Sequence, residues 1–144
     1  FMIDERQLSE AIQYGADAIL LIVACLDDEQ LGHLHRLATG AGLAALVEVH
    51  NQNELERALA IDARLIGVNN RDLTDFTVDL GLTERLANLI VGGDGPERIL
   101  VAESGIHTRS DVARLEDCGA KAILVGTSLM SQPDIEGKVS ELLG

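Results

Sequence analysis

Short apolar runs alternate along the chain with longer segments that repeat apolar residues at helical spacing. Five of the apolar runs lack the polar alternation of a half-exposed strand, which predicts parallel strands covered by helices. They span residues 18–23, 44–47, 65–68, 99–102 and 122–125. The periodic segments predict helices over residues 5–14, 28–40, 52–60, 82–90, 109–118 and 135–143. The pattern therefore predicts an α/β protein of five parallel strands with flanking helices.

This repetition of one strand and one helix fits two architectures. An open, doubly wound sheet is complete with five strands, whereas an eight-stranded barrel cannot close with five. The sequence contains no Gly-x-Gly-x-x-Gly or Walker motif that would favour a nucleotide-binding open sheet. The pattern of apolar and polar positions leaves both architectures open.

Composition narrows the possible partners. The 144 residues include 11 basic and 24 acidic side chains, a net charge of −13, and only 2% are aromatic. This charge disfavours binding to nucleic acid and anionic membranes, and few aromatic rings are present to stack on bases.

The longest apolar run, residues 18–26, is too short to cross a bilayer, and no signal peptide is visible. Cys25 and Cys118 are expected to be buried free thiols in a reducing cytoplasm. The length of 144 residues fits one compact domain.

Carboxylates stand at the ends of two predicted strands. Parallel strands of either architecture present ligand sites at their carboxyl ends. Glu48 and Glu103 follow apolar residues there, and a buried carboxylate without a partner is costly. Each could be a solvated strand end, but the apolar surroundings favour a functional role. Asn69 and Arg71 follow the third strand, and Asn70 between them is interpreted as a turn residue.

Two small polar turns follow the last two predicted strands. Ser104-Gly105 and Gly126-Thr127 each precede a helix. Either could be a tight turn alone, but together their backbone N–H groups suit a phosphate, as after strands seven and eight of a barrel. His50 is expected to help begin a helix, as is the histidine at position 107. The spacing of the four histidines predicts no metal site.

Four segments in this order resemble indole-3-glycerol-phosphate synthase of tryptophan biosynthesis. They are residues 45–50 (ALVEVH), 66–73 (IGVNNRDL), 102–106 (AESGI) and 124–130 (LVGTSLM). The resemblance covers essentially the whole chain. It implies a partial (β/α)8 TIM barrel, with these strands as the family's fourth to eighth. Residues 1–144 would be a single C-terminal barrel segment, incomplete at its N-terminus.

The resemblance also implies an activity. The family, a group of carbon–carbon lyases, converts 1-(2-carboxyphenylamino)-1-deoxyribulose 5-phosphate to indole-3-glycerol phosphate by ring closure, decarboxylation and dehydration. No cofactor is expected. By matching position, Glu48 would be the general base, and Glu103 and Asn69 would act beside it. The substrate-binding residues would be Arg71 and Ser104 for the anthranilate part, and Gly105, Gly126 and Thr127 for the phosphate.

Part of the family's active site has no counterpart in these residues. The catalytic lysine of the family's third strand would precede Phe1 by two residues, and the glutamate and lysine of its first strand are also missing. The chain alone is therefore expected to be inactive. Besides a phosphorylated small substrate, the expected partners are the missing N-terminal barrel segment or a second copy of the chain, because two sheet edges would be unpaired. The alternatives are another phosphate-binding barrel enzyme, such as a ribose-phosphate isomerase, and a non-catalytic, self-associating half-barrel or flavodoxin-like module.

Overall fold

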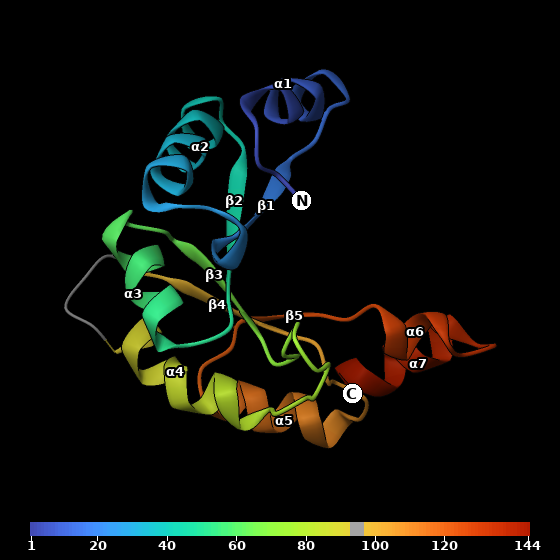
Figure 1. The fold of residues 1–144 in the computed structure, drawn as a ribbon. Helices are drawn as coiled ribbons and strands as arrows, with labels where there is room; N and C mark the ends of the chain where they lie inside the picture. Colours follow the sequence, from blue (N-terminus) through green and yellow to red (C-terminus); the bar gives the residue numbers. More distant parts are fainter. Residues whose placement is uncertain (93–96) are drawn as a thin grey trace.

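A single parallel sheet forms the centre of the protein. The computed structural model describes residues 1–92 and 97–144, and in these residues five strands pair in sequence order (Figure 1). The strands are β1 (Ala18–Ile22), β2 (Ala44–Val49), β3 (Leu65–Asn69), β4 (Ile99–Glu103) and β5 (Ala122–Leu124). A doubly wound sheet reverses its strand order at a switch point. The order β1-β2-β3-β4-β5 is instead that of a barrel segment, so the flavodoxin-like alternative is wrong.

The helices follow the predicted pattern closely. They are α1 (Glu5–Gln13), α2 (Asp28–Gly40), α3 (Gln52–Ala60), α4 (Gly81–Val91), α5 (Arg109–Asp117) and α7 (Ile135–Leu143), with the unpredicted short helices η1 (Val23–Cys25) and α6 (Thr127–Met130). Figure 1 shows α2 to α5 following one another along one side of the sheet, with α6 and α7 beyond β5. None of the helices in the described ranges is long and apolar enough to cross a membrane.

The two faces of the sheet have different surroundings. On the helix side, alternate strand residues such as Val47 are fully buried in the apolar core. On the opposite side, the parallel register aligns one level of apolar side chains across four strands: Leu20, Leu46, Leu65 and Ile99. Leu20 remains 38% exposed and Ile99 46% exposed. The described residues therefore leave this face, the interior face of a barrel, partly uncovered.

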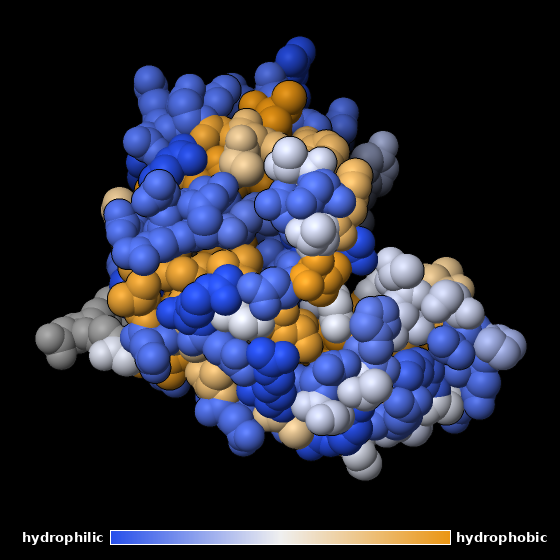
Figure 2. Space-filling model, turned by 60° about the horizontal axis from the view of Figure 1, so that its bottom comes forward, coloured by the Kyte–Doolittle hydropathy of each residue, from blue (hydrophilic) through white to orange (hydrophobic). Residues whose placement is uncertain are grey.

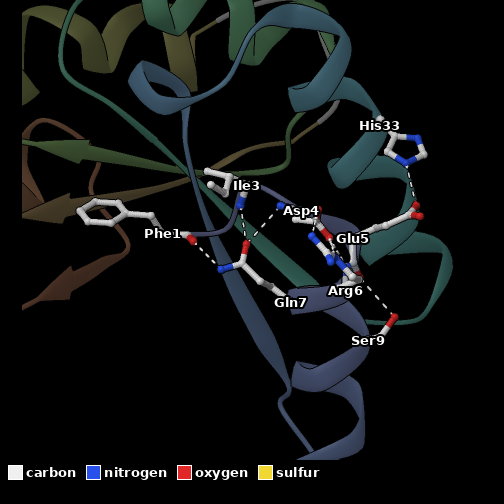
Figure 3. Close-up of polar contacts among 8 residues, drawn as sticks. All are labelled: Phe1, Ile3, Asp4, Glu5, Arg6, Gln7, Ser9 and His33. Carbon is white, nitrogen blue, oxygen red and sulfur yellow. Dashed lines mark hydrogen bonds and ion pairs between the residues drawn. The ribbon is translucent and has the colours of Figure 1, made fainter.

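Hydrogen bonds within its first turn anchor α1 (Figure 3). The Asp4 side chain caps the helix, and Gln7 Oε1 accepts from the backbone N–H groups of Ile3 at 2.8 Å and Asp4 at 3.1 Å. These two side chains form a capping box. On the outer surface, Glu5 Oε2 lies 3.2 Å from His33 Nε2 of α2. Since both side chains of this pair are largely exposed, it contributes little to stability.

Polar residues predominate on one face of the protein (Figure 2). The face seen in Figure 2 is largely hydrophilic, with smaller apolar areas between its polar residues.

Cys118 is half-buried, but Cys25 is exposed, so the prediction of a buried thiol is wrong for Cys25. The reason is local, because β1 ends at Ile22 and the turn of η1 carries Cys25 outward.

Candidate active site

The carboxyl ends of β2, β3 and β4 bring three polar side chains together. Asn69 Nδ2 donates a hydrogen bond to Glu48 Oε1 at 3.2 Å, and Asn69 is the register partner of Glu103. Exposure is only 5% for Glu48, 8% for Asn69 and 3% for Glu103. We call these three residues the carboxylate cluster. The structure thus places side by side the residues that the sequence analysis assigned to catalysis.

Gly67 provides the space that Glu103 occupies. The register pairs Gly67 with Glu48 on one side and Val101 on the other. A Cβ atom at position 67 would overlap Glu103 Oε1 and would lie 3.2 Å from Leu46 Cδ1. The Glu103 carboxyl group therefore lies directly over the glycine backbone, a position that any other residue would close.

The two carboxyl groups of the cluster differ in protonation. Burial and the neighbouring carboxylate of Glu48 raise the pKa of Glu103 to about 8. Burial also raises the pKa of Glu48, but its contacts with His50, Glu103 and Asn69 outweigh burial and bring that pKa below the ordinary value. Glu103 Oε1 is buried without a hydrogen-bond partner among the described residues, which disfavours its charged form. At neutral pH, Glu48 is thus ionised and Glu103 protonated, a pairing that supplies a base and an acid.

A cavity of about 190 Å³ lies beside the cluster, at the ends of β4 and β5. Its walls are residues 104–107, residues 124–128 and Arg71. The cavity therefore brings together all of the remaining predicted site residues: Arg71, Ser104, Gly105, Gly126 and Thr127. Gly126 is the N-cap of α6, whose first N–H groups have no acceptor within the helix. Free N–H groups and an arginine suit an anion. We call it the anion cavity.

Asn70 fixes the turn that joins the cluster to the anion cavity. Its Nδ2 donates to the carbonyl oxygens of Glu103 at 3.0 Å and Ser104 at 3.3 Å, and its Oδ1 accepts from Thr83 Oγ1 at 2.8 Å. Ser104 has a φ of +64°, which is uncommon for a residue with a side chain. Asn70 is 2% exposed. The interpretation of Asn70 as an ordinary turn residue is therefore wrong, because its amide binds two other segments.

We expect Asn70→Ala to destabilise the protein by roughly 2 kcal/mol, because it leaves buried partners without hydrogen bonds. Denaturant unfolding monitored by circular dichroism measures this change. Asn53→Ala is the matched control, since Asn53 is exposed on α3. A free energy of unfolding within 0.5 kcal/mol of the wild type, roughly the scatter of surface substitutions, would contradict the role given to Asn70.

His50 joins the site in a way that the sequence analysis missed. Its ring lies between two carboxylates, with Nε2 3.2 Å from Glu48 Oε1 and Nδ1 3.1 Å from Glu54 Oε2. The expected part in beginning α3 is also present, because the His50 N–H donates to Glu54 Oε2. The signal was the two-residue spacing from Glu48, which places side chains on one face of an extended chain.

Asn51 caps the start of α3, because its Oδ1 accepts from the backbone N–H of Glu54 at 2.9 Å. The Glu54 carboxylate accepts from the backbone N–H of His50. Within residues 1–92 and 97–144, no group of three or more His, Cys, Asp or Glu side chains has the geometry to hold a metal ion.

Solved structures of other enzymes share this fold. A 3-hexulose-6-phosphate synthase aligns over 98% of this chain and 68% of its own, with a TM-score of 0.76 and 16% identity. Thiamine phosphate pyrophosphorylase from Pyrococcus furiosus aligns over 94% of this chain and 62% of its own, with a TM-score of 0.70 and 20% identity. At these identities the likeness shows a common fold and leaves the chemistry open.

Sequence comparison is more specific. Indole-3-glycerol phosphate synthase of Roseiflexus castenholzii (strain DSM 13941 / HLO8) is 56% identical over 100% of this chain and 53% of its own length. The synthase of Dehalococcoides mccartyi (strain CBDB1) is 52% identical over 99% of this chain and 54% of its own length. The chain thus spans about half the length of these curated relatives. The sequence profile described as indole-3-glycerol phosphate synthase matches residues 1–142. The chain belongs to the indole-3-glycerol phosphate synthase family.

Proposed function

We propose that this chain forms the larger part of a synthase active site that converts 1-(2-carboxyphenylamino)-1-deoxyribulose 5-phosphate to indole-3-glycerol phosphate. The enzyme would be a carbon–carbon lyase that closes the indole ring with loss of carbon dioxide and water. The observation that supports this proposal is the ionised Glu48 and protonated Glu103, held together next to a cavity suited to an anion.

In this proposal, each part of the site has one task. Glu48 is the general base, and Asn69 orients it through the hydrogen bond to Oε1. Glu103 holds a proton beside it. In the anion cavity, Gly105 and the first N–H groups of α6 bind the substrate phosphate, which supplies binding energy remote from the reacting atoms.

Arg71 and Ser104 are proposed to bind the anthranilate part of the substrate. Both line the anion cavity, next to the turn that follows Glu103. Arg71 is tied to β3 because its backbone N–H donates to Asn69 Oδ1 at 3.1 Å. A guanidinium that lines this cavity suits the substrate carboxylate as a bidentate partner.

The chain offers no lysine at this site. The sequence contains only Lys121 and Lys138. Lys121 lies at the amino end of β5, whereas the site lies at the carboxyl ends of the strands, and Lys138 of α7 donates to the carbonyl oxygen of His107 at 2.6 Å. We therefore propose that an N-terminal barrel segment supplies the catalytic lysine and covers the exposed apolar face of the sheet. The isolated chain is proposed to be inactive.

A fusion experiment tests the proposed function. The N-terminal half of the Roseiflexus castenholzii synthase would be joined ahead of Phe1, and formation of indole-3-glycerol phosphate would be followed by its indole fluorescence. We expect turnover by the fusion and none by the 144-residue chain or the N-terminal half alone. A fusion that is monomeric and cooperatively folded but inactive would refute the proposed activity. Turnover by the chain alone would refute the need for an N-terminal segment.

A further inference from the structure

The ring of His50 connects the carboxylate cluster to α3. Glu48 is on β2 and His50 follows two residues later, whereas Glu54 lies in the first turn of α3. The side chains of His50 and Glu54 are 11% and 15% exposed, so the three groups form a largely buried line of carboxylate, imidazole and carboxylate. The pKa of a buried carboxyl group depends on the charges and hydrogen bonds around it. The His50 ring and Glu54 must therefore affect the pKa of Glu48.

Glu54 is held firmly at the far end of this line. Its Oε1 accepts from Asn51 Nδ2 at 2.7 Å, and its Oε2 accepts from both the backbone N–H and the ring Nδ1 of His50, at 2.8 and 3.1 Å. Because both of its oxygens accept hydrogen bonds, the Glu54 carboxylate is held in one orientation. It therefore fixes the orientation of the His50 ring and the hydrogen on Nδ1.

Both ring nitrogens of His50 face acceptors. A neutral imidazole has a hydrogen on one nitrogen only, so it would present a lone pair to either Glu48 or Glu54. The imidazolium form presents a hydrogen to each. Nε2 lies 3.2 Å from Glu48 Oε1, a distance at which an imidazolium and a carboxylate attract each other. The geometry consequently favours a positively charged His50 beside Glu48.

We infer that His50, held by Glu54, is a positioning residue that keeps Glu48 ionised and thereby directs the proton shared by the carboxylate cluster to Glu103. The assignment rests on the proposed function for its catalytic meaning, but the placement of the proton is a property of this chain. Three carboxyl groups surround the His50 ring and interact with it: Glu48 on β2, Glu54 on α3 and Glu103 on β4.

The protonation of these groups agrees with the inferred role. The carboxylates of Glu48 and then Glu54 raise the pKa of His50 to about 9, although burial opposes the rise. The pKa of Glu54 is lowered, because its contacts with His50 outweigh its burial. His50 is therefore charged over the pH range in which Glu48 has to be a base. His50 lowers the pKa of both carboxyl groups, but it contacts Glu48 directly and acts on Glu103 through charge alone. Without His50, the difference between the pKa values of Glu48 and Glu103 would therefore be smaller.

The first measurement uses the 144-residue chain itself. The pKa values of Glu48, Glu103 and His50 would be followed by carbon-13 NMR titration of labelled carboxyl and imidazole groups, in the wild type and in His50→Gln. We expect His50→Gln to raise the pKa of Glu48 by about 1 unit, the lower end of the effect of an adjacent opposite charge. Glu54→Gln is expected to act in the same direction by a smaller amount and to lower the pKa of His50.

The matched control is His33→Gln, which removes a second His–Glu contact of 3.2 Å that lies on the surface between α1 and α2 (Figure 3). It is expected to leave the pKa of Glu48 unchanged. If His50→Gln does not fold, Glu54→Gln decides the matter. An unchanged pKa of Glu48 in the folded variants, or a His50 that is neutral at pH 7, would overturn the inference.

The second measurement is the pH dependence of kcat/KM in the fusion with the N-terminal half of the relative. His50→Gln is expected to shift the acid limb upward by about 1 pH unit, because Glu48 must be ionised to act as the base. A purely structural role would lower activity at all pH values and leave the limb in place, which would also overturn the inference. An inactive wild-type fusion with shifted pKa values in the NMR titration would instead refute the proposed function and support the proton placement.

Discussion

Replacing Glu48 with Gln in the fusion enzyme is expected to lower kcat/KM by about 10² to 10⁴-fold, the usual contribution of a general base. Glutamine keeps nearly the same shape, and its Oε1 still accepts from Asn69 Nδ2. The variant therefore removes the charge and the basicity but leaves the packing in place. We also expect the pKa of Glu103 to fall from about 8, since the Glu48 carboxylate is one of the causes of its rise.

The control for this prediction is Glu56→Gln, on the exposed side of α3. Steady-state fluorescence assays of both variants, with thermal unfolding to show that each is folded, separate a catalytic loss from a folding loss. Retention of more than about a tenth of the wild-type kcat/KM by Glu48→Gln would remove Glu48 from the role of general base, since the expected loss is at least about 10²-fold.

Replacing Gly67 with Ala is expected to displace Glu103 and to lower kcat/KM on the order of 10²-fold, the effect of misplacing a catalytic group by about 1 Å. The new Cβ overlaps the end of a flexible side chain instead of backbone, so the carboxyl group can move while the sheet is retained. Once displaced toward water, Glu103 loses the burial that raises its pKa, and we expect that pKa to fall.

NMR titration of Glu103 and kinetic assays of the fusion measure the two effects of Gly67→Ala. Gly40→Ala is the matched control, because Gly40 ends α2 and a Cβ there meets nothing within 4 Å. A Gly67→Ala variant that keeps both its activity and a Glu103 pKa near 8 would show that the glycine is not needed for the carboxyl position.

Most of the fold was predictable because it depends on local pattern. The apolar run at β3 and the periodic helix that follows β2 each define one element, and their boundaries fall within two residues of the prediction. The meeting of Glu48, Asn69 and Glu103 was also predictable, because the carboxyl ends of parallel strands share one edge. The choice between a barrel segment and an open sheet was not, because strand order depends on which strands pair.

The parts of the site that were missed depend on packing between elements. The role of Gly67 follows only from the register that places it between Glu48 and Val101. Asn70 can bind two segments because α4 brings Thr83 within hydrogen-bond distance of its side chain. At the start of α3, the His50 backbone N–H binds the Glu54 carboxylate, which in a capping box would accept from the N–H of the N-cap residue. No pattern in the sequence measures such competition.

The overlap between a side chain at position 67 and the Glu103 carboxyl group also constrains how this sequence can drift. As long as Glu103 is kept, every substitution at Gly67 is opposed. If Glu103 were first replaced by a small residue, position 67 would be free to gain a side chain. That side chain would then fill the space and block the return of glutamate. Loss of the acid therefore removes the steric reason for glycine at position 67, and a side chain gained there would keep the acid from returning to its place.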